Sequence, residues 1–150
     1  MLDLRRSYLV MIKNSVGSRM FRNSYVIKDG RRKDILQNGE LSCAFFATFI
    51  LKGFNLIGAP HCTVQGAIKD LIKSGWQEIK ISEKIPSGAV LLWEKQKGHF
   101  HLGFYLGNWE AVSNSRENKC PIVHHWTFNS SRKIIKAYSH KFLEDRSVCR

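Results

Sequence analysis

The chain has 150 residues, of which 43% are apolar and 11% aromatic, so it can fill one hydrophobic core and needs no second domain. Lysine and arginine outnumber aspartate and glutamate by 24 to 12, and this excess favours polyanionic partners such as nucleic acid or another anionic polymer. The longest apolar run, Cys43 to Leu51, is far shorter than the roughly 20 residues that span a bilayer, which argues against an integral membrane segment.

The N-terminal stretch MLDLRRSYLVMIKNSVGSRM has no continuous apolar segment followed by a small-residue cleavage site. It is therefore not a classical signal peptide, and we expect a cytoplasmic protein or one exported by a non-classical route. The four cysteines show no CxxC pair and no regular spacing, which favours one reactive thiol among bystanders over a disulfide framework. They are Cys43, Cys62, Cys120 and Cys149.

Apolar residues at helical spacing predict an amphipathic helix from Leu2 to about Val16. A short strand is expected at 25–27, before the turn signal Asp29-Gly30. A second helix is predicted between Ser42, a good N-cap residue, and Gly53, a typical C-terminal stop. Nearly every residue between them is apolar, so this helix should be buried on most of its surface.

Thr63 can cap a third helix that runs from Val64 to Lys73. The pattern then changes to that of strands, with a tight turn at Gly107-Asn108. Five segments carry it: IPSGAVLLWE, HFHLGFYLG, EAVSNS, PIVHHWTF and KIIKAYSH. The order predicts an α+β fold, with N-terminal helices packed on one face of an antiparallel sheet of about five strands.

Cys43 stands at the start of the second predicted helix, where unpaired N–H groups and the helix dipole stabilise a thiolate. His99 and His101 lie on one predicted strand and share a face with Gly103, whose missing side chain lets a helix or a substrate approach closely. A cysteine at a helix tip facing a histidine on a strand is the nucleophile and base pair of papain-like chemistry.

Three features together resemble the NlpC and CHAP families of cell-wall cysteine hydrolases: SCAFF opening a buried helix, a Pro-Ser-Gly turn before an apolar strand, and HLGFYLGN. The resemblance runs from about Gly39 to Ser115. It implies one papain-like domain over 1–150, with an extension at 1–38 and a catalytic core at 39–140. It also implies hydrolysis of a peptide or amide bond of peptidoglycan through a thioester, without a cofactor, and the basic surface suits an anionic wall polymer.

The same resemblance assigns Cys43 as the nucleophile and His101 as the base. The third catalytic position of these families falls on Ser113, where this chain departs from the usual His or Asn. Asn114 would serve if a bulge turned it inward, and His124 or His125 would serve if the next strand curled back.

Two donors are candidates for stabilising the oxyanion. One is the backbone N–H of Cys43, at the start of its helix. The other is Gln37, six residues before the cysteine, at the separation found in papain-type enzymes.

A zinc site is an alternative interpretation of the same residues. His99 and His101 on one strand could bind zinc together with Cys43, Cys62 or a histidine of the 124–125 pair, although the spacing matches no standard finger. Stoichiometric metal and resistance to alkylation would identify it.

A non-catalytic domain that binds nucleic acid is a third interpretation. Basic residues alternate along the chain with four tryptophans, which could stack on bases. Tryptophans in a small α+β domain are more often core residues, however. They are Trp76, Trp93, Trp109 and Trp126.

Overall fold

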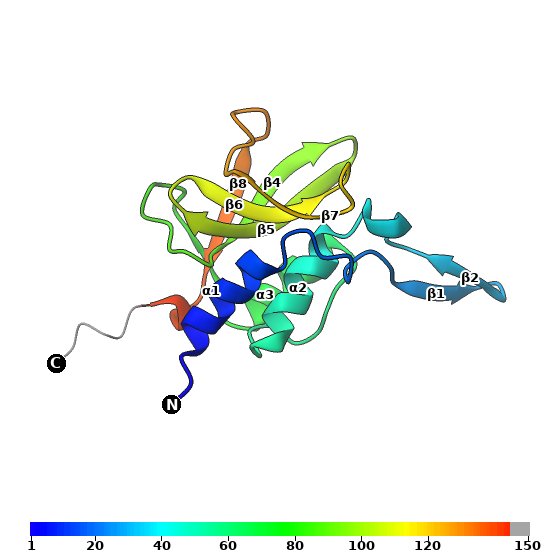
Figure 1. The fold of residues 1–150 in the computed structure, drawn as a ribbon, viewed down its shortest axis with the longest axis horizontal. Helices are drawn as coiled ribbons and strands as arrows, with labels where there is room; N and C mark the ends of the chain where they lie inside the picture. The colour runs from blue at the N-terminus through cyan, green and yellow to red at the C-terminus, as the bar shows by residue number, and fades with distance from the viewer. Residues whose placement is uncertain (145–150) are drawn as a thin grey trace.

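In the computed structural model, which describes residues 1–144, three helices lie on one side of an antiparallel sheet (Figure 1). The helices are α1 (Leu4–Asn14), α2 (Cys43–Gly53) and α3 (Val64–Lys73), with short 3-10 turns η1 (Gln37–Gly39) and η2 (Lys141–Leu143). The sheet has six strands in the order β3-β8-β4-β5-β6-β7. These are β3 (Gln77–Ile79), β4 (Val90–Gln96), β5 (His99–Gly107), β6 (Glu110–Ser115), β7 (Cys120–His125) and β8 (Ile134–Ser139).

The prediction of an α+β fold, with N-terminal helices beside an antiparallel sheet, is confirmed at this level of description. The sheet has one strand more than the five expected segments, because β3 pairs with β8 at the edge. A second sheet pairs β1 (Tyr25–Lys28) with β2 (Arg31–Asp34). Both missed strands, QEI and RRKD, are short and mostly polar, so the apolar alternation that reveals a strand is missing from them.

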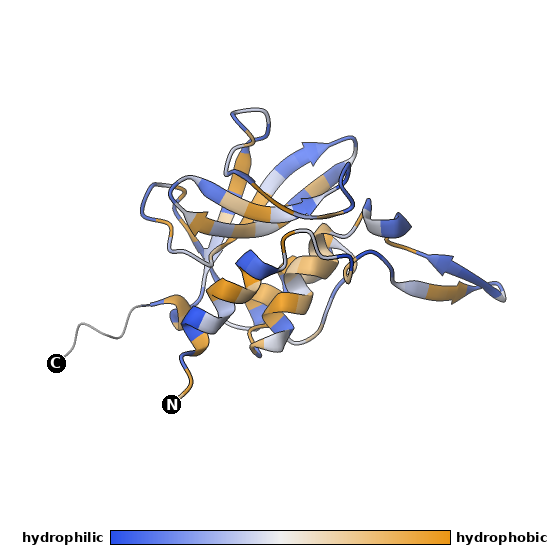
Figure 2. Cartoon of the chain, in the orientation of Figure 1, coloured by the Kyte–Doolittle hydropathy of each residue, from blue (hydrophilic) through white to orange (hydrophobic). Residues whose placement is uncertain are grey.

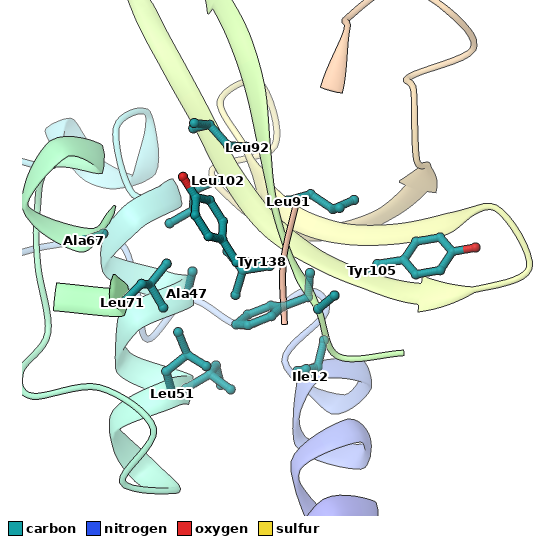
Figure 3. Packing of buried hydrophobic residues seen from close by; sticks show 14 of the residues in the cluster. Ile12, Ala47, Leu51, Ala67, Leu71, Leu91, Leu92, Leu102, Tyr105 and Tyr138 are labelled. Atoms are coloured by element: carbon teal, nitrogen blue, oxygen red, sulfur yellow. The ribbon is translucent and has the colours of Figure 1, made fainter. Parts of the chain in front are cut away.

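Helix α2 packs against the middle of the sheet, as its apolar sequence predicts. Figure 3 shows Ala47 and Leu51 of α2 beside Leu71 of α3, with Leu102 of β5 pointing toward the helices. Because side chains alternate along a strand, the odd-numbered residues of β5 point to the other face, as the ring of Tyr105 does in Figure 3. The helix thus fixes which face of β5 is closed and which remains for other contacts.

The β1–β2 hairpin projects from the rest of the molecule as an arm (Figure 1). Figure 2 shows β2 as hydrophilic along its length. The Asp34 carboxylate ties the base of the arm, accepting hydrogen bonds from the N–H groups of Ser24, Leu36 and Asn38 and from the side chain of Asn23. An isolated two-stranded hairpin is marginally stable, so this clamp accounts for the defined position of the arm.

None of the helices in residues 1–144 is both long enough and apolar enough to cross a bilayer. This agrees with the expectation from the sequence that the chain has no integral membrane segment.

Asp70 on α3 holds the loop that leads into this helix. Its carboxylate accepts hydrogen bonds from the N–H groups of Gly58 and Ala59, from the His61 ring at 2.6 Å and from the Ser74 hydroxyl. Burial raises the pKa of Asp70, but the hydrogen bonds, led by that of His61, outweigh it and lower the pKa to about 2. The loop therefore depends on an ionised carboxylate.

Replacement of Asp70 by asparagine is expected to lower the free energy of unfolding by about 2 kcal/mol at neutral pH, because several hydrogen bonds to a charged acceptor are lost. Since the folded pKa lies below the unfolded one, the contribution of Asp70 is complete above about pH 4 and is lost as the pH falls through about 2. Urea unfolding measures both effects. Asp29→Asn, at the exposed tip of the arm, is the charge-matched control, and an equal loss in both variants would contradict the assignment.

Candidate active site

A cavity of about 830 Å³ opens where the first turns of α2 and α3 meet the β4–β5 and β6–β7 turns. Cys43, His101, Ser113 and Asn114 all contribute to its lining. Four residues singled out by the sequence, from three different elements, therefore reach one cavity. Gln37 is exposed and is not among the lining residues, so its placement lends no support to the oxyanion role expected for it.

Cys43 reaches the cavity at a place where two strands separate. The pairing of β5 with β6 runs from Gly107 down to the pair Gly103–Ser113 and then stops. The backbone N–H and C=O of Tyr105 form hydrogen bonds on the side of β5 that faces β4. Because backbone groups alternate sides along a strand, the C=O of Phe100 points to the opposite side, where β6 no longer pairs with β5. The Cys43 Sγ lies 4.0 Å from that carbonyl oxygen. The tip of α2 thus fills the opening next to the backbone of His101.

The thiol and the imidazole line the same cavity but form no hydrogen bond with each other. His101 pairs across the strands with Trp93, whose ring lies 5.4 Å from the imidazole, and so its side chain leaves β5 on the face opposite to Leu102. Hydrogen bonds between catalytic groups are often long or absent before a substrate binds. Catalysis by this pair requires the two side chains to meet around the open edge of β5.

Gly103 brings β6 close to His101. A Cβ atom on this residue would lie 2.6 Å from the Val112 carbonyl oxygen and 2.7 Å from the Ser113 Cβ, closer than such atoms approach each other. The sequence predicts that a helix or a substrate uses the space beside Gly103. The structure corrects this expectation: the neighbouring strand uses it, and the result is that Ser113 is drawn toward the imidazole.

Ser113 joins two histidines. Its Oγ lies 2.8 Å from His101 Nε2 and 2.7 Å from His124 Nε2, while His124 Nδ1 lies 2.8 Å from the carbonyl oxygen of His125. A carbonyl only accepts, so His124 must donate through Nδ1, and its Nε2 must then accept from the Ser113 hydroxyl. The lone pair of Ser113 is left to accept from His101 Nε2–H. This chain of bonds leaves Nδ1 of His101 as the proton-accepting atom.

The candidates for the third catalytic position are thus separated. Ser113, the position indicated by the resemblance, is the residue that hydrogen-bonds His101, and His124 supports it from behind. The Asn114 amide instead donates to the carbonyl of Gly39 at 2.7 Å, and its Oδ1 is buried without a partner among the described residues. His125 is exposed, and its ring bonds Thr127. Only Ser113 of these four positions is in place to orient the imidazole.

The environment favours the neutral forms of the His101 imidazole and the Cys43 thiol around neutral pH. Burial lowers the pKa of His101 to about 3, assisted by the charges of Arg132 and His124, and burial also lowers the pKa of His124. Burial raises the pKa of Cys43, although N–H groups of Leu102 and Ala44 and the charge of Arg132 act in the opposite direction. The sequence-based expectation of a thiolate at the helix tip was therefore wrong in sign, because desolvation exceeds the effect of the helix terminus.

Helix α2 begins at Cys43, as predicted, but Ser42 does not cap it. The side chain of Ser42 makes no capping bond, and its Oγ is buried without a partner among the described residues. No backbone acceptor within residues 1–144 takes the N–H groups of Cys43 and Ala44, which instead lie toward the Cys43 sulfur and lower its pKa. These N–H groups at a helix start are suitable donors for an oxyanion that forms beside the sulfur.

The remaining cysteines differ in their relation to the cavity. Cys62 lines it together with Cys43, whereas Cys120 does not. Cys149 lies outside the described residues. Within residues 1–144, no group of three or more histidine, cysteine, aspartate or glutamate side chains is arranged to hold a metal ion, so the zinc interpretation gains no support from this geometry.

The tryptophans do not form one stacking surface. Trp76 and Trp93 are buried in the core, with 2% and 0% of their surface exposed. Trp109 is about half exposed and packs against Trp126 with ring centres 5.1 Å apart. Trp76 and Trp93 are thus core residues, as is usual in a small α+β domain, and their rings are not available to stack on bases.

Alkylation of Cys43 by iodoacetamide is expected to be slow at neutral pH and to rise about tenfold per pH unit up to at least pH 9. The reason is that a raised pKa leaves little thiolate below that pH. Peptide mapping by mass spectrometry after timed labelling of the native protein measures the rate. A rate that already levels off near pH 7 would show a thiolate–imidazolium pair and contradict the neutral site.

No protein-family model matches the chain, and no curated protein matches it.

Proposed function

We propose that the protein is a papain-like cysteine hydrolase that cleaves an amide or peptide bond through a thioester. The observation that carries the proposal is the chain from His101 through Ser113 to His124, which ends on a backbone carbonyl and orients the imidazole in the cavity that Cys43 also lines. The motif resemblance to the NlpC and CHAP families supports the same reading and suggests peptidoglycan peptides as substrates.

The reaction begins from a neutral thiol and a neutral imidazole. As the Cys43 sulfur attacks the substrate carbonyl carbon, its proton passes to Nδ1 of His101, and the N–H groups at the start of α2 stabilise the oxyanion. The imidazolium then protonates the leaving amine as the C–N bond breaks, and a thioester remains on Cys43. Water attacks the thioester, with His101 accepting its proton, and releases the carboxylic acid while the thiol is restored.

A panel of peptides and soluble fragments derived from peptidoglycan tests the proposal. Cleavage is measured by the release of new amino groups, and the intermediate by mass spectrometry of an acyl adduct on Cys43. We expect both for at least one member of the panel, and neither in a Cys43→Ser variant. Cleavage that persists in this variant, or the absence of both signals across the panel, would contradict the proposal.

A second candidate function, binding of nucleic acid, is favoured by the β1–β2 arm. Residues directly opposite each other share a face, so Lys28 with Arg31 and Val26 with Lys33 form one side of the ribbon. Three of these four residues are cations, all four are exposed, and the facing pair Lys28–Arg31 repels itself. A two-stranded ribbon fits the major groove of duplex DNA, where phosphates would relieve the repulsion.

Fluorescence anisotropy with a duplex oligonucleotide at several salt concentrations tests this second function. Glutamine at Lys28, Arg31 and Lys33 should reduce the slope of log affinity against log salt by about 3, because about one counterion per contact is no longer released. The matched control carries glutamine at three exposed lysines outside the arm, namely Lys52, Lys69 and Lys80. An equal change in the two triple variants, or no binding at low salt, would exclude the arm as a nucleic-acid site.

A further inference from the structure

Arg132 reaches the candidate active site from the loop between β7 and β8. It lines the same cavity as Cys43 and His101, and it is half-buried there. Its charge lowers the pKa of both residues, which agrees with a position close to the sulfur. Lys97 and Arg116 also line the cavity but are exposed, whereas Arg132 is the cation whose charge acts on the thiol.

Two backbone carbonyls hold the guanidinium in a fixed orientation. Nε donates to the carbonyl of Glu94 at 3.0 Å, and Nη2 donates to that of His99 at 2.8 Å. The adjoining N–H of Lys133 bonds the Glu94 carboxylate at 2.9 Å, which ties the loop to β4. Neither carbonyl carries a formal charge, so these bonds orient the positive charge of Arg132 without neutralising it.

The described acidic side chains near Arg132 form no ion pair with it, although the charges of Glu94 and Glu117 offset part of the lowering of its pKa by burial. Within residues 1–144, no carboxylate lies within ion-pair distance of this guanidinium. Of the two acidic residues that line the cavity, Glu40 pairs with Arg116 and Glu117 accepts a hydrogen bond from Ser115. Nη1 of the guanidinium has no partner among the described residues. The planar N–H groups of an arginine fit the two oxygens of a carboxylate, so Nη1 is available to bind one.

We propose that Arg132 forms a carboxylate-binding subsite beside Cys43. Combined with the proposed hydrolase function, on which this step rests, the subsite defines the substrate class: peptides with a free carboxylate next to the scissile amide, such as a C-terminal carboxylate or an acidic side chain. The Arg132 charge serves twice, since it binds this group and favours the developing thiolate.

The subsite can be tested with two alkylating reagents that differ in charge, without any substrate. Iodoacetate carries a carboxylate and iodoacetamide does not, and each loses iodide as sulfur bonds to its carbon. We expect the iodoacetate-to-iodoacetamide rate ratio at Cys43 to exceed that at Cys120, outside the cavity, by about tenfold, as expected for a cation at short range. Because both reagents need the same thiolate, a change in the pKa of Cys43 cancels in the ratio.

In Arg132→Gln the ratio at Cys43 should fall to that at Cys120, while Arg132→Lys should keep part of the preference. If Arg132→Gln does not fold, acetate should still slow the iodoacetamide labelling of Cys43 in the unsubstituted protein, and acetamide should not. An equal ratio at the two cysteines, a ratio unchanged by Arg132→Gln, or no protection by acetate would overturn the subsite. A high ratio without any hydrolysis would contradict the proposed hydrolase function and support the subsite. Hydrolysis together with equal ratios at the two cysteines would contradict the subsite and support the hydrolase function.

Discussion

Replacement of Cys43 by alanine is expected to lower kcat/KM for amide hydrolysis by at least about 10⁴-fold, because the variant has no nucleophile to form the thioester. What remains would come from binding and from the N–H groups at the start of α2, which the substitution leaves in position. The fold should persist, since the side chain is partly buried and its hydrogen bond to the Phe100 carbonyl oxygen, at 4.0 Å, is weak.

Two matched controls separate chemistry from packing in this experiment. Cys62→Ala removes a second thiol that lines the same cavity, and Cys120→Ala removes one outside it. Both variants should retain activity close to that of the unsubstituted protein, because neither thiol takes part in the proposed reaction. If Cys62→Ala lost activity and Cys43→Ala kept it, the nucleophile would be Cys62, and its assignment to Cys43 would be wrong.

The elements that the sequence predicts best are those with strong end signals. Helix α3 begins at Val64, as expected, because the Thr63 side chain accepts from the N–H of Gly66. The five strands from β4 to β8 were visible because apolar residues alternate or cluster along them. Ser42 correctly predicts where α2 begins, but not the reason: it stands at the N-cap position, and its side chain forms no capping hydrogen bond.

The parts of the site that the sequence could not predict depend on distances between strands. Ser113 meets His124 because the β6–β7 pairing sets Ser113 opposite Ile122 and so places His124 on the diagonal. That register is determined by the turn between the strands, and one residue more in the turn would have turned His124 away. The position of Arg132 comes from a loop without periodicity, and the pKa of Cys43 follows from burial depth, which helix signals do not report.

Replacement of Ser113 by alanine is expected to reduce kcat/KM by about 10²–10³-fold, because the imidazole loses the bond that selects its tautomer. His124→Ala should cost less, since Ser113 can still accept from His101, and the double variant should be no worse than Ser113→Ala alone if the three act in series.

These variants also give a readout independent of turnover. The ¹⁵N chemical shifts of the His101 ring should show the proton on Nε2 in the unsubstituted protein and a mixture of tautomers in Ser113→Ala. The His125 carbonyl can only accept, and this sets the direction of every hydrogen bond in the chain, so the tautomer of His101 is determined by a group three steps away from its ring. A proton found on Nδ1 of His101 would reverse the chain and leave the proposed base without a lone pair for the thiol.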